Sequence, residues 1–549
     1  MRSTRKNYEM SNRNQHIHYG LIIIVCFFAF FINNQVVPAD IMEARNLATA
    51  QEMVREGNYL VPTMNDELRL EKPPLPTWIA AGIEHITPGN LVVQRYATGL
   101  VATLMIIFLY LLVSRIARNR TIGLISALIL ATCYNVVFMG RTATWDIYCH
   151  SFMLGAIYFL ILAFEKEGKQ WLHFILSGAF MGLSFLGKGP VSFYALLLPF
   201  IISYGIIYRP RLKGKILPLL TMVVICLAIS SWWTLYILIF HKDIALSVAQ
   251  KESSSWLNHN VRPWYYYWGF AAETGIWSLF LLTSIIYFFV KKKYSHKYRK
   301  EYAFSVFWLL ASLVLLSIIP EKKTRYLLPI SIPGSIVIAF YIYQSIKDIS
   351  SKSEKVIFRL NAIVIALILI AIPVAIYMFF FREDMITLPI FICITIFSWA
   401  LGIYIIRCCF NPIKVAGIFA AIILTMVMVE ALCLIPIGQV FINQDRHSIR
   451  LLRQNQKVQG LPFYHNQDED LRIELVYEAN QTIKPINTAD SIAIQKNKPF
   501  VFVSEAPIEN VFANQNVTIE HIDIFDNNWR QSDHKRYNPN LVRRVAIIR

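Results

Sequence analysis

The residues Arg69-Leu-Glu-Lys-Pro-Pro-Leu-Pro76 place a carboxylate and an ammonium group side by side within a run of prolines. Proline restricts its own φ and the conformation of the residue before it, so Glu71 and Lys72 are expected to lie in a nearly rigid extended segment. A cation held in one position suits the capture of a phosphate group, because its geometry need not be assembled when the ligand arrives. The stretch therefore predicts a phosphate contact through Lys72.

Further cationic residues occur at intervals along a chain that is otherwise strongly apolar. Those expected at the same membrane face, with one neighbouring tyrosine, are Arg141, Lys188, Arg262, Lys323, Arg325 and Tyr326. Charged groups at membrane depth are costly and tend to mark function, although each one alone could be an interfacial anchor or part of an ion bridge. Their convergence predicts an anionic ligand, and in a lipid-embedded protein the natural anion is a phosphate or diphosphate on a prenyl chain.

Three carboxylates are expected at this face as well: Asp40, Glu43 and Asp146. Carboxylates near a sugar phosphate can act as a general base or can stabilise positive charge that develops at the anomeric carbon. Asp40 and Glu43 are one helical turn apart, so both could face the same site.

A divalent metal is a further hypothesis, because the carboxylate of Glu71 and the imidazole of His259 are both of the ligand types that zinc accepts. The aromatic run from Trp264 to Trp268 is typical of a membrane-interface belt, and packing against a sugar ring or a prenyl chain is its alternative interpretation.

Composition indicates an integral membrane protein. Of the 549 residues 56% are hydrophobic and 16% are charged, and the mean hydropathy is +0.46, whereas soluble proteins carry about a quarter charged residues. Crossing a bilayer takes roughly 20 apolar residues. We expect thirteen spans, near residues 17–34, 91–113, 121–138, 148–164, 172–187, 190–208, 216–240, 272–290, 304–319, 327–346, 359–381, 387–406 and 414–436.

Lysine and arginine gather in alternate loops. The basic segments are residues 2–13, 115–120, 166–169, 209–215, 291–300, 347–359 and 407–414. Because cytoplasmic loops are enriched in these residues, the pattern predicts a cytoplasmic N-terminus and an external C-terminus. Most of the net charge of +18 then lies in loops that set the orientation of the protein in the membrane. Anchoring of these basic runs against anionic lipid explains them better than nucleic-acid binding does.

The predicted fold class is an all-α polytopic membrane domain, residues 1–436, followed by a small external α/β domain, residues 437–549. The first external segment, residues 35–90, should contain helices near 39–56 and 75–86. Alternating or β-branched runs in the C-terminal domain predict strands near 471–477, 498–504, 517–524 and 541–548.

Several blocks together resemble the bacterial C-type glycosyltransferases, near the branch of the aminoarabinose lipid A transferase and the protein O-mannosyltransferases. In the first external segment the similar residues are Glu43-Ala-Arg, Ala50-Gln-Glu-Met53, Gly57-Asn-Tyr59, Val61-Pro62, Glu71-Lys-Pro-Pro-Leu75 and Trp78. Three further blocks follow in the family's order: Arg141-Thr-Ala-Thr-Trp-Asp146, Gly182-Leu-Ser-Phe-Leu-Gly-Lys-Gly-Pro190 and Lys323-Thr-Arg-Tyr-Leu-Leu-Pro329.

This resemblance implies a multi-pass enzyme of the bacterial inner membrane with a periplasmic active site. It would move a sugar from a polyprenyl (undecaprenyl) phosphate to lipid A, another glycolipid or a protein, by direct displacement with inversion. Lys72, Lys188 and Arg262 would hold the donor phosphate, and Asp146 or Glu43 would accept a proton from an acceptor hydroxyl.

The chain departs from the family pattern at two places. Relatives usually have adjacent Asp and Glu in the first loop, whereas here Met42 precedes Glu43 and the nearest aspartate is Asp40. Arg325 stands where many relatives have an uncharged residue, which adds a cation beside Lys323.

A transporter or flippase of lipid-linked sugars is the competing interpretation. Alternating access favours charges near the bilayer midplane and related halves. The expected charges gather at one face instead and no paired halves are visible in the sequence, so the enzyme is favoured.

Overall fold

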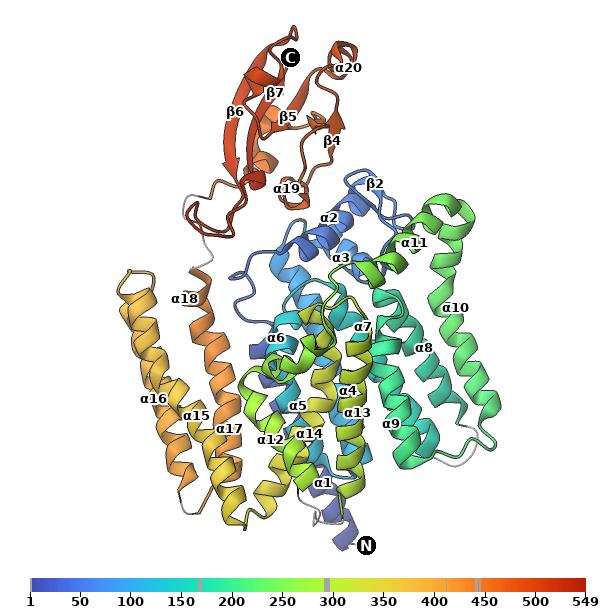
Figure 1. The fold of residues 1–549 in the computed structure, drawn as a ribbon, viewed down its shortest axis with the longest axis vertical. Coiled ribbons are helices and arrows are strands. Elements are labelled where there is room, and N and C mark those ends of the chain that lie inside the picture. The colour runs from blue at the N-terminus through green and yellow to red at the C-terminus, as the bar shows by residue number, and fades with distance from the viewer. Residues whose placement is uncertain (1, 166–169, 291–296, 411, 440–442, 444–445) are drawn as a thin grey trace. The chain divides into compact units, whose positions relative to one another are not determined.

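The computed structural model describes residues 2–549 apart from 166–169, 291–296, 411, 440–442 and 444–445 (Figure 1). The basic segment 166–169 and part of the basic segment 291–300 therefore lie outside the described residues. The chain divides into two compact units. The helical unit contains residues 1–34, 71–75 and 95–436, and the α/β unit contains residues 35–70, 76–94 and 437–549.

Long apolar helices build most of the helical unit. Its elements, two of which extend slightly past the unit's limits, are α1 (Arg2–Phe30), α4 (Leu91–Ile116), α5 (Arg120–Ala131), α6 (Tyr134–Gly140), α7 (Trp145–Glu165), α8 (Trp171–Lys188), η1 (Phe193–Leu197), α9 (Leu198–Tyr208), α10 (Ile216–Phe240), α11 (Lys242–Asn258), η2 (Trp264–Trp277), α12 (Ser278–Val290), α13 (Arg299–Ile318), η3 (Thr324–Leu327), α14 (Leu328–Lys347), α15 (Lys352–Ile376), η4 (Tyr377–Phe381), α16 (Leu388–Cys409), α17 (Val415–Met428), η5 (Val429–Cys433) and α18 (Leu434–Gln439).

Membrane-spanning length is a property of many of these helices. Among the described residues, nine helices are long and apolar enough to cross a membrane, or ten if α5 and α6, which meet at a bend of 66°, form one span. Gln15–Phe30 and Phe193–Tyr208 are shorter apolar helices. The chain is a mostly helical, multi-pass membrane protein, as predicted. Each of the thirteen expected spans overlaps a helix, but thirteen crossings are not confirmed.

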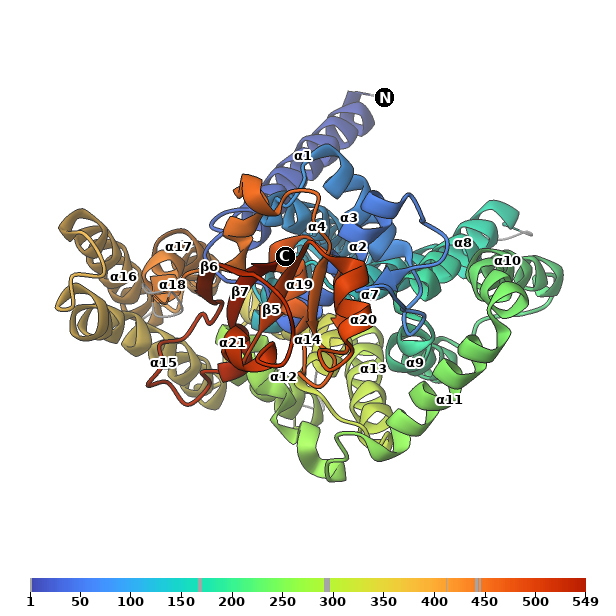
Figure 2. The same cartoon turned by 90° about the horizontal axis from the view of Figure 1, so that it is seen from above.

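Burial distinguishes the inner helices of the helical unit from the outer ones. In their most apolar windows, 89% of the residues of η3–α14 and 72% of those of α7 are buried, against 22% for α10 and for α16. Figures 1 and 2 show α14 between a group formed by α15, α16 and α17 and a group formed by α8, α9 and α10. Outer helices can leave apolar side chains exposed because lipid tails are as apolar as leucine.

The C-terminal part of the α/β unit is a five-stranded sheet with the strand order β4-β3-β5-β7-β6. The first three strands in this order are parallel, and β7 pairs antiparallel with both of its neighbours. Its elements are β3 (Phe463–Asn466), α19 (Ile473–Ala479), β4 (Ile483–Ile486), α20 (Ser491–Asn497), β5 (Phe500–Ser504), α21 (Ile508–Val511), β6 (Ile519–Asp526) and β7 (Val542–Ile548). The strands predicted near 498–504, 517–524 and 541–548 are confirmed as β5, β6 and β7.

The strand predicted near residues 471–477 is wrong, because this segment contains the helix α19. Residues 475–479 are all buried in succession, whereas a strand with one exposed face would alternate. The helix packs against α2 (Ile41–Glu56). Tertiary packing has therefore overridden a local β pattern.

Both helices expected in the first external segment are present. The first is α2, which ends at Gly57, a residue with φ of +69° that closes the helix in a left-handed conformation. The second is α3 (Leu75–Ile86). Between them lies a short antiparallel pair, β1 (Thr63–Met64) and β2 (Glu67–Leu68).

Candidate functional site

Asp146 and Lys188 form a buried ion pair in the helical unit. The Lys188 ammonium donates a hydrogen bond to the Asp146 carboxylate, and the two side chains are only 8% and 2% exposed. Asp146 lies in the first turn of α7 and Lys188 in the last turn of α8. Each charge thus occupies the helix end at which the helix dipole stabilises it. Burial of either charge without the other would be costly.

Small residues allow these two helices to meet closely. A Cβ atom at Gly187 would lie 3.1 Å from the backbone nitrogen of Cys149, and the hydroxyl of Ser184 donates a hydrogen bond of 2.6 Å to the carbonyl oxygen of Cys149. Gly189 then ends α8 with φ of +77°. The residues Gly187-Lys-Gly189 therefore position the Lys188 ammonium at the start of α7.

A cavity of about 560 Å³ lies among α7, η1, η2, α13 and η3. Its lining residues are His150, Val191, Tyr194, Ala195, Tyr267, Leu316, Ile319, Glu321 and Tyr326. Tyr326 connects this cavity to two of the predicted cations, because Lys188 Nζ lies 5.4 Å and Lys323 Nζ 5.7 Å from the centre of its ring. Cations over an aromatic face are favourably placed. The predicted residues Lys188, Lys323 and Tyr326 therefore lie close together, and Tyr326 lines the cavity.

The loop before η2 is joined to the loop before η3. Val261 and Glu321 form an antiparallel bridge, and the backbone nitrogen of Arg262 donates to the carbonyl oxygen of Pro320 at 3.2 Å. The buried Lys322 ammonium donates to the carbonyl oxygens of Ile319 and Arg262, at 2.6 and 3.2 Å. These contacts between the two loops fix the backbone next to Lys323.

Glu321 is the acidic member of this loop pair. Its carboxylate is buried and lies 2.5 Å from Lys323 Nζ and 3.7 Å from His259 Nδ1. His259 is 61% exposed, and the side chain of Arg262 is exposed as well. Arg325 is half-buried and interacts electrostatically with Asp146. Lys323 and Arg325 thus add positive charge around Asp146 and the cavity.

The Glu71–Leu75 segment belongs to the helical unit, although the residues on both sides of it belong to the α/β unit. Glu71 and Lys72 are half-buried, and Oε2 of Glu71 is buried with no hydrogen-bond partner in the structure. The proline-rich stretch is therefore grouped with the membrane helices and not with the residues on either side of it.

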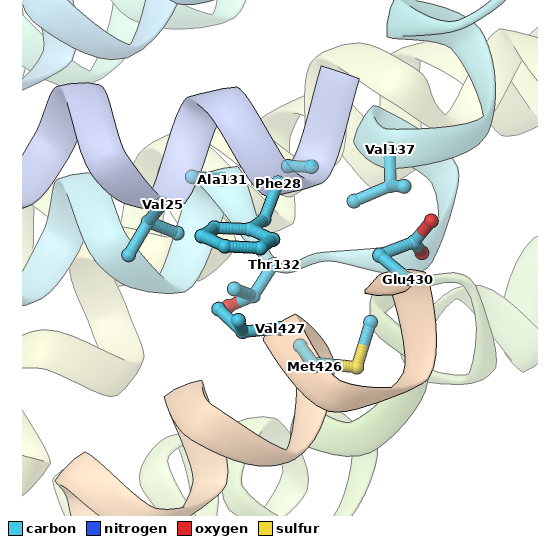
Figure 3. A pocket seen from close by; sticks show the side chains of 9 residues that line it. Val25, Phe28, Ala131, Thr132, Val137, Met426, Val427 and Glu430 are labelled. Atoms are coloured by element: carbon cyan, nitrogen blue, oxygen red, sulfur yellow. The ribbon is translucent and has the colours of Figure 1, made fainter. Parts of the chain in front are cut away.

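Arg141 has a different environment from the other predicted cations. Its guanidinium donates to the carbonyl oxygens of Ala29, at 2.7 Å, and of Ile32, near the end of α1. Nη1 also lies 2.9 Å from Oε2 of Glu430 in η5. Glu430 borders an apolar cavity of about 190 Å³ between α1, α5 and η5 (Figure 3). These contacts tie three segments together immediately before α7.

Asp40 and Glu43 lie in the α/β unit. The Asp40 side chain accepts a hydrogen bond of 2.7 Å from the backbone nitrogen of Glu43, so Asp40 is the N-terminal cap of α2. Glu43 is fully buried. Burial raises the pKa of the Tyr477 phenol in α19, and the nearby charges of Glu478 and Glu43 raise it further.

The hypothesis of a metal bound by Glu71 and His259 stays a prediction. Over the described ranges, the single group of three or more clustered metal-ligand side chains is Glu52, Glu56 and Asp66, which includes neither residue. Glu52 in that group is already hydrogen-bonded, since its carboxylate accepts from Thr63 and from the backbone nitrogens of Asn65 and Asp66, at 2.7–2.8 Å. It organises the β1–β2 turn.

Sequence reasoning did not single out His150, Tyr267, Glu321 or Glu430. His150 and Glu430 are polar residues inside apolar spans, a signal that could have selected them. Tyr267 and Glu321 stand within segments already noted, but their roles depend on the pairing of two loops that are distant in sequence.

Comparison with known proteins identifies relatives of this chain. Residues 71–234 match the family described as dolichyl-phosphate-mannose-protein mannosyltransferase. The chain is 27% identical over 349 residues to an uncharacterized protein of Aquifex aeolicus, covering 63% of this chain and 67% of the relative. It is 26% identical over 375 residues to the undecaprenyl phosphate-alpha-4-amino-4-deoxy-L-arabinose arabinosyl transferase of Shewanella sediminis, covering 64% of this chain and 65% of the relative, just under two thirds of that protein.

A solved structure extends the similarity to nearly the whole chain. ArnT from Cupriavidus metallidurans, bound to undecaprenyl phosphate, superimposes with a TM-score of 0.67 at 14% identity and covers 97% of both chains. The fold is therefore that of the structural class to which ArnT belongs. Within this class, the chain resembles the aminoarabinosyl transferase branch in sequence.

Proposed function

We propose that this protein is a glycosyltransferase that moves a sugar from a polyprenyl phosphate, with undecaprenyl phosphate as the preferred carrier, to an acceptor at the periplasmic face of the bacterial inner membrane. The observation that supports it best is the buried Asp146–Lys188 pair, which lies near Tyr326 in the wall of a cavity, with Lys323 also close to that ring. The N-terminus is proposed to be cytoplasmic and the domain formed by residues 437–549 periplasmic.

The cations act on the donor phosphate. Lys188 and Lys323, which both lie near the ring of Tyr326, bind its oxygens together with Lys72, Arg262 and Arg325. As the bond between the anomeric carbon and the phosphate oxygen breaks, the bonding electron pair stays on that oxygen. The cations neutralise this growing negative charge, which is the usual way in which a preorganised site lowers a barrier. Polyprenyl phosphate is the leaving group.

The acceptor oxygen attacks the anomeric carbon from the opposite side, which inverts its configuration. If the acceptor is a hydroxyl, its proton passes to a carboxylate, and Asp146 or Glu43 is the proposed base. If the acceptor is an anionic phosphate, no proton is released and the carboxylates orient the reactants. We propose lipid A, another glycolipid or a protein as the acceptor, with the lipid A phosphate preferred because the relatives include many aminoarabinosyl transferases.

Two predicted residues receive altered roles in this proposal. Arg141 is held by the end of α1 and by Glu430, so it supports the corner before α7 instead of binding the donor. Asp40 caps α2. A transporter is not retained, because the similar proteins with named activities are transferases.

The experiment is a transfer assay with the full chain in lipid nanodiscs. Radiolabelled undecaprenyl phosphate carrying 4-amino-4-deoxy-L-arabinose, mannose or glucose is incubated with lipid A and with membrane extract, and the products are identified by mass spectrometry. A new glycosidic product that depends on Lys188 supports the proposal. Movement of labelled donor across proteoliposomes with no covalent product would support a transporter instead.

A further inference from the structure

His150 is a buried polar residue that the proposed chemistry has not used. It lies on α7, one helical turn after Asp146, so the two side chains are on the same side of the helix. The residue is only 1% exposed, and its Nδ1 atom has no hydrogen-bond partner. It also lines the 560 Å³ cavity.

An unsatisfied ring nitrogen in such a position is informative. Nearly all buried polar side-chain atoms in proteins have a hydrogen-bond partner, because burial without one costs free energy. An exception on a cavity wall indicates a partner that enters the cavity. A ligand with a hydroxyl or amino group would supply it, since imidazole can accept a hydrogen bond at one nitrogen and donate at the other.

Two of the tyrosine hydroxyls that line the cavity have hydrogen-bond partners already. The Tyr194 hydroxyl donates to the carbonyl oxygen of Leu315 at 2.6 Å. The Tyr267 hydroxyl lies 3.0 Å from the backbone nitrogen and 3.1 Å from the carbonyl oxygen of Lys323. Both rings are therefore held as apolar walls. Glu321 is engaged by Lys323, whereas the buried Nδ1 atom of His150 has no hydrogen-bond partner.

This combination favours a sugar over a prenyl chain as the occupant. The cavity is lined mostly by apolar and aromatic side chains with few polar groups, which is how small-molecule sites orient a ligand. A sugar ring offers apolar faces to aromatic walls and hydroxyls to a polar anchor. An isoprenoid chain would leave the His150 nitrogen unsatisfied.

We propose that His150 hydrogen-bonds a hydroxyl or amino substituent of the donor sugar and thereby determines which sugar is accepted. This rests on the proposed function, in which Lys188 and Lys323 bind the adjoining phosphate beside Tyr326. The sugar would extend from that phosphate into the cavity, between the rings of Tyr194 and Tyr267.

The test compares His150→Phe, His150→Asn and a matched control, His465→Phe, which replaces a buried histidine of the α/β unit whose Nδ1 atom also has no hydrogen-bond partner. Each variant in nanodiscs is assayed for kcat/KM and Kd with undecaprenyl phosphate carrying 4-amino-4-deoxy-L-arabinose, mannose or glucose, and for Kd with bare undecaprenyl phosphate. His150→Phe should lower kcat/KM for the preferred sugar about 10- to 100-fold, the range expected when one polar contact to a substrate is lost. The ratio of its kcat/KM values for the preferred sugar and for the other sugars should fall towards one.

Bare undecaprenyl phosphate should bind His150→Phe within about twofold of the original affinity, because a phosphate contact is unchanged. His150→Asn, which keeps a polar atom near the Nδ1 position, should restore part of the preference, and the control His465→Phe should keep it. An unchanged sugar preference in His150→Phe would overturn the inference, as would an equal loss of affinity for the bare carrier. If the unsubstituted protein forms no product, the transferase proposal fails, and the Kd ratios among the same donors still decide whether His150 recognises the sugar.

Discussion

The ammonium of Lys188 donates a hydrogen bond to the carboxylate of Asp146, and both charges are buried at the ends of adjacent helices. A donor phosphate that reaches Lys188 must share this cation with Asp146. The pair therefore links the stability of the helical unit to the chemistry proposed for it.

Lys188→Met should abolish transfer and also destabilise the protein, because Asp146 is left as a buried charge without its partner. Breaking such a pair costs about 3–5 kcal/mol, whereas replacing both charges with apolar residues is often nearly neutral. Asp146→Leu combined with Lys188→Met should therefore regain much of the thermal stability in detergent and none of the activity. Equal melting temperatures for the single and double variants would contradict a strongly coupled pair.

Lys72→Ala should reduce transfer by about 10²- to 10³-fold, equivalent to about 2–4 kcal/mol of transition-state stabilisation. Lys72→Arg should rescue poorly, because a planar fork does not reproduce a compact ammonium. A suitable control is Lys484→Ala, which removes a half-exposed lysine that is paired with Asp66 in the α/β unit. Near-normal turnover by well-folded Lys72→Ala would remove this residue from the donor site.

The carboxylates should respond differently to substitution. Asp40→Ala should cost about 1 kcal/mol of stability through loss of the α2 cap, and Asp40→Ser should recover it, with little change in kcat. Asp146→Asn or Glu43→Gln should lower kcat by at least about 10²-fold if the acceptor is a hydroxyl, and less if it is a phosphate. The measurement is steady-state kinetics with both acceptors. Full activity in both amide variants would refute carboxylate participation.

Glu430→Ala should destabilise the helical unit more than Glu430→Gln does. Removal of the carboxylate leaves the buried Arg141 guanidinium with only its carbonyl partners near the end of α1, and an amide can replace one polar contact. Thermal unfolding followed by size-exclusion chromatography measures the difference. The apparent KM for donor should change little in Glu430→Gln; a large rise would indicate that Arg141 contacts the donor after all.

Topology can be mapped with reporter fusions. The distribution of lysine and arginine predicts that reporters fused after residues 60 and 549 are periplasmic and that one fused after residue 350 is cytoplasmic. An alkaline phosphatase and a fluorescent reporter at each position give opposite signals, which serves as the internal control. A cytoplasmic signal at residue 549 would mean an even number of crossings.

Local sequence was sufficient for most of the membrane helices and for three of the five strands of the C-terminal sheet. A chain that is 56% hydrophobic, with regularly recurring apolar stretches, can bury its backbone polar groups in a bilayer only as helices. The strands β5, β6 and β7 were predictable from β-branched runs, since their pattern persists over five to eight residues. The cap at Asp40 was not predicted, although an aspartate three residues before Glu43 at the start of a helix is typical of a capping pattern.

Tertiary structure alone decided which charged residues meet. Asp146 and Lys188 are far apart in sequence and come together because Gly187 and Ser184 let α8 approach Cys149 of α7. Arg141 looked equivalent to Lys188 as an isolated cation, yet Glu430, from near the end of the last apolar helix, and the carbonyls near the end of α1 engage it. The charges and their spacing in the sequence indicate which groups could bind an anion. The energy of a buried charge, however, depends on the partners that packing brings within a few ångströms. Segments that are distant in sequence supply those partners.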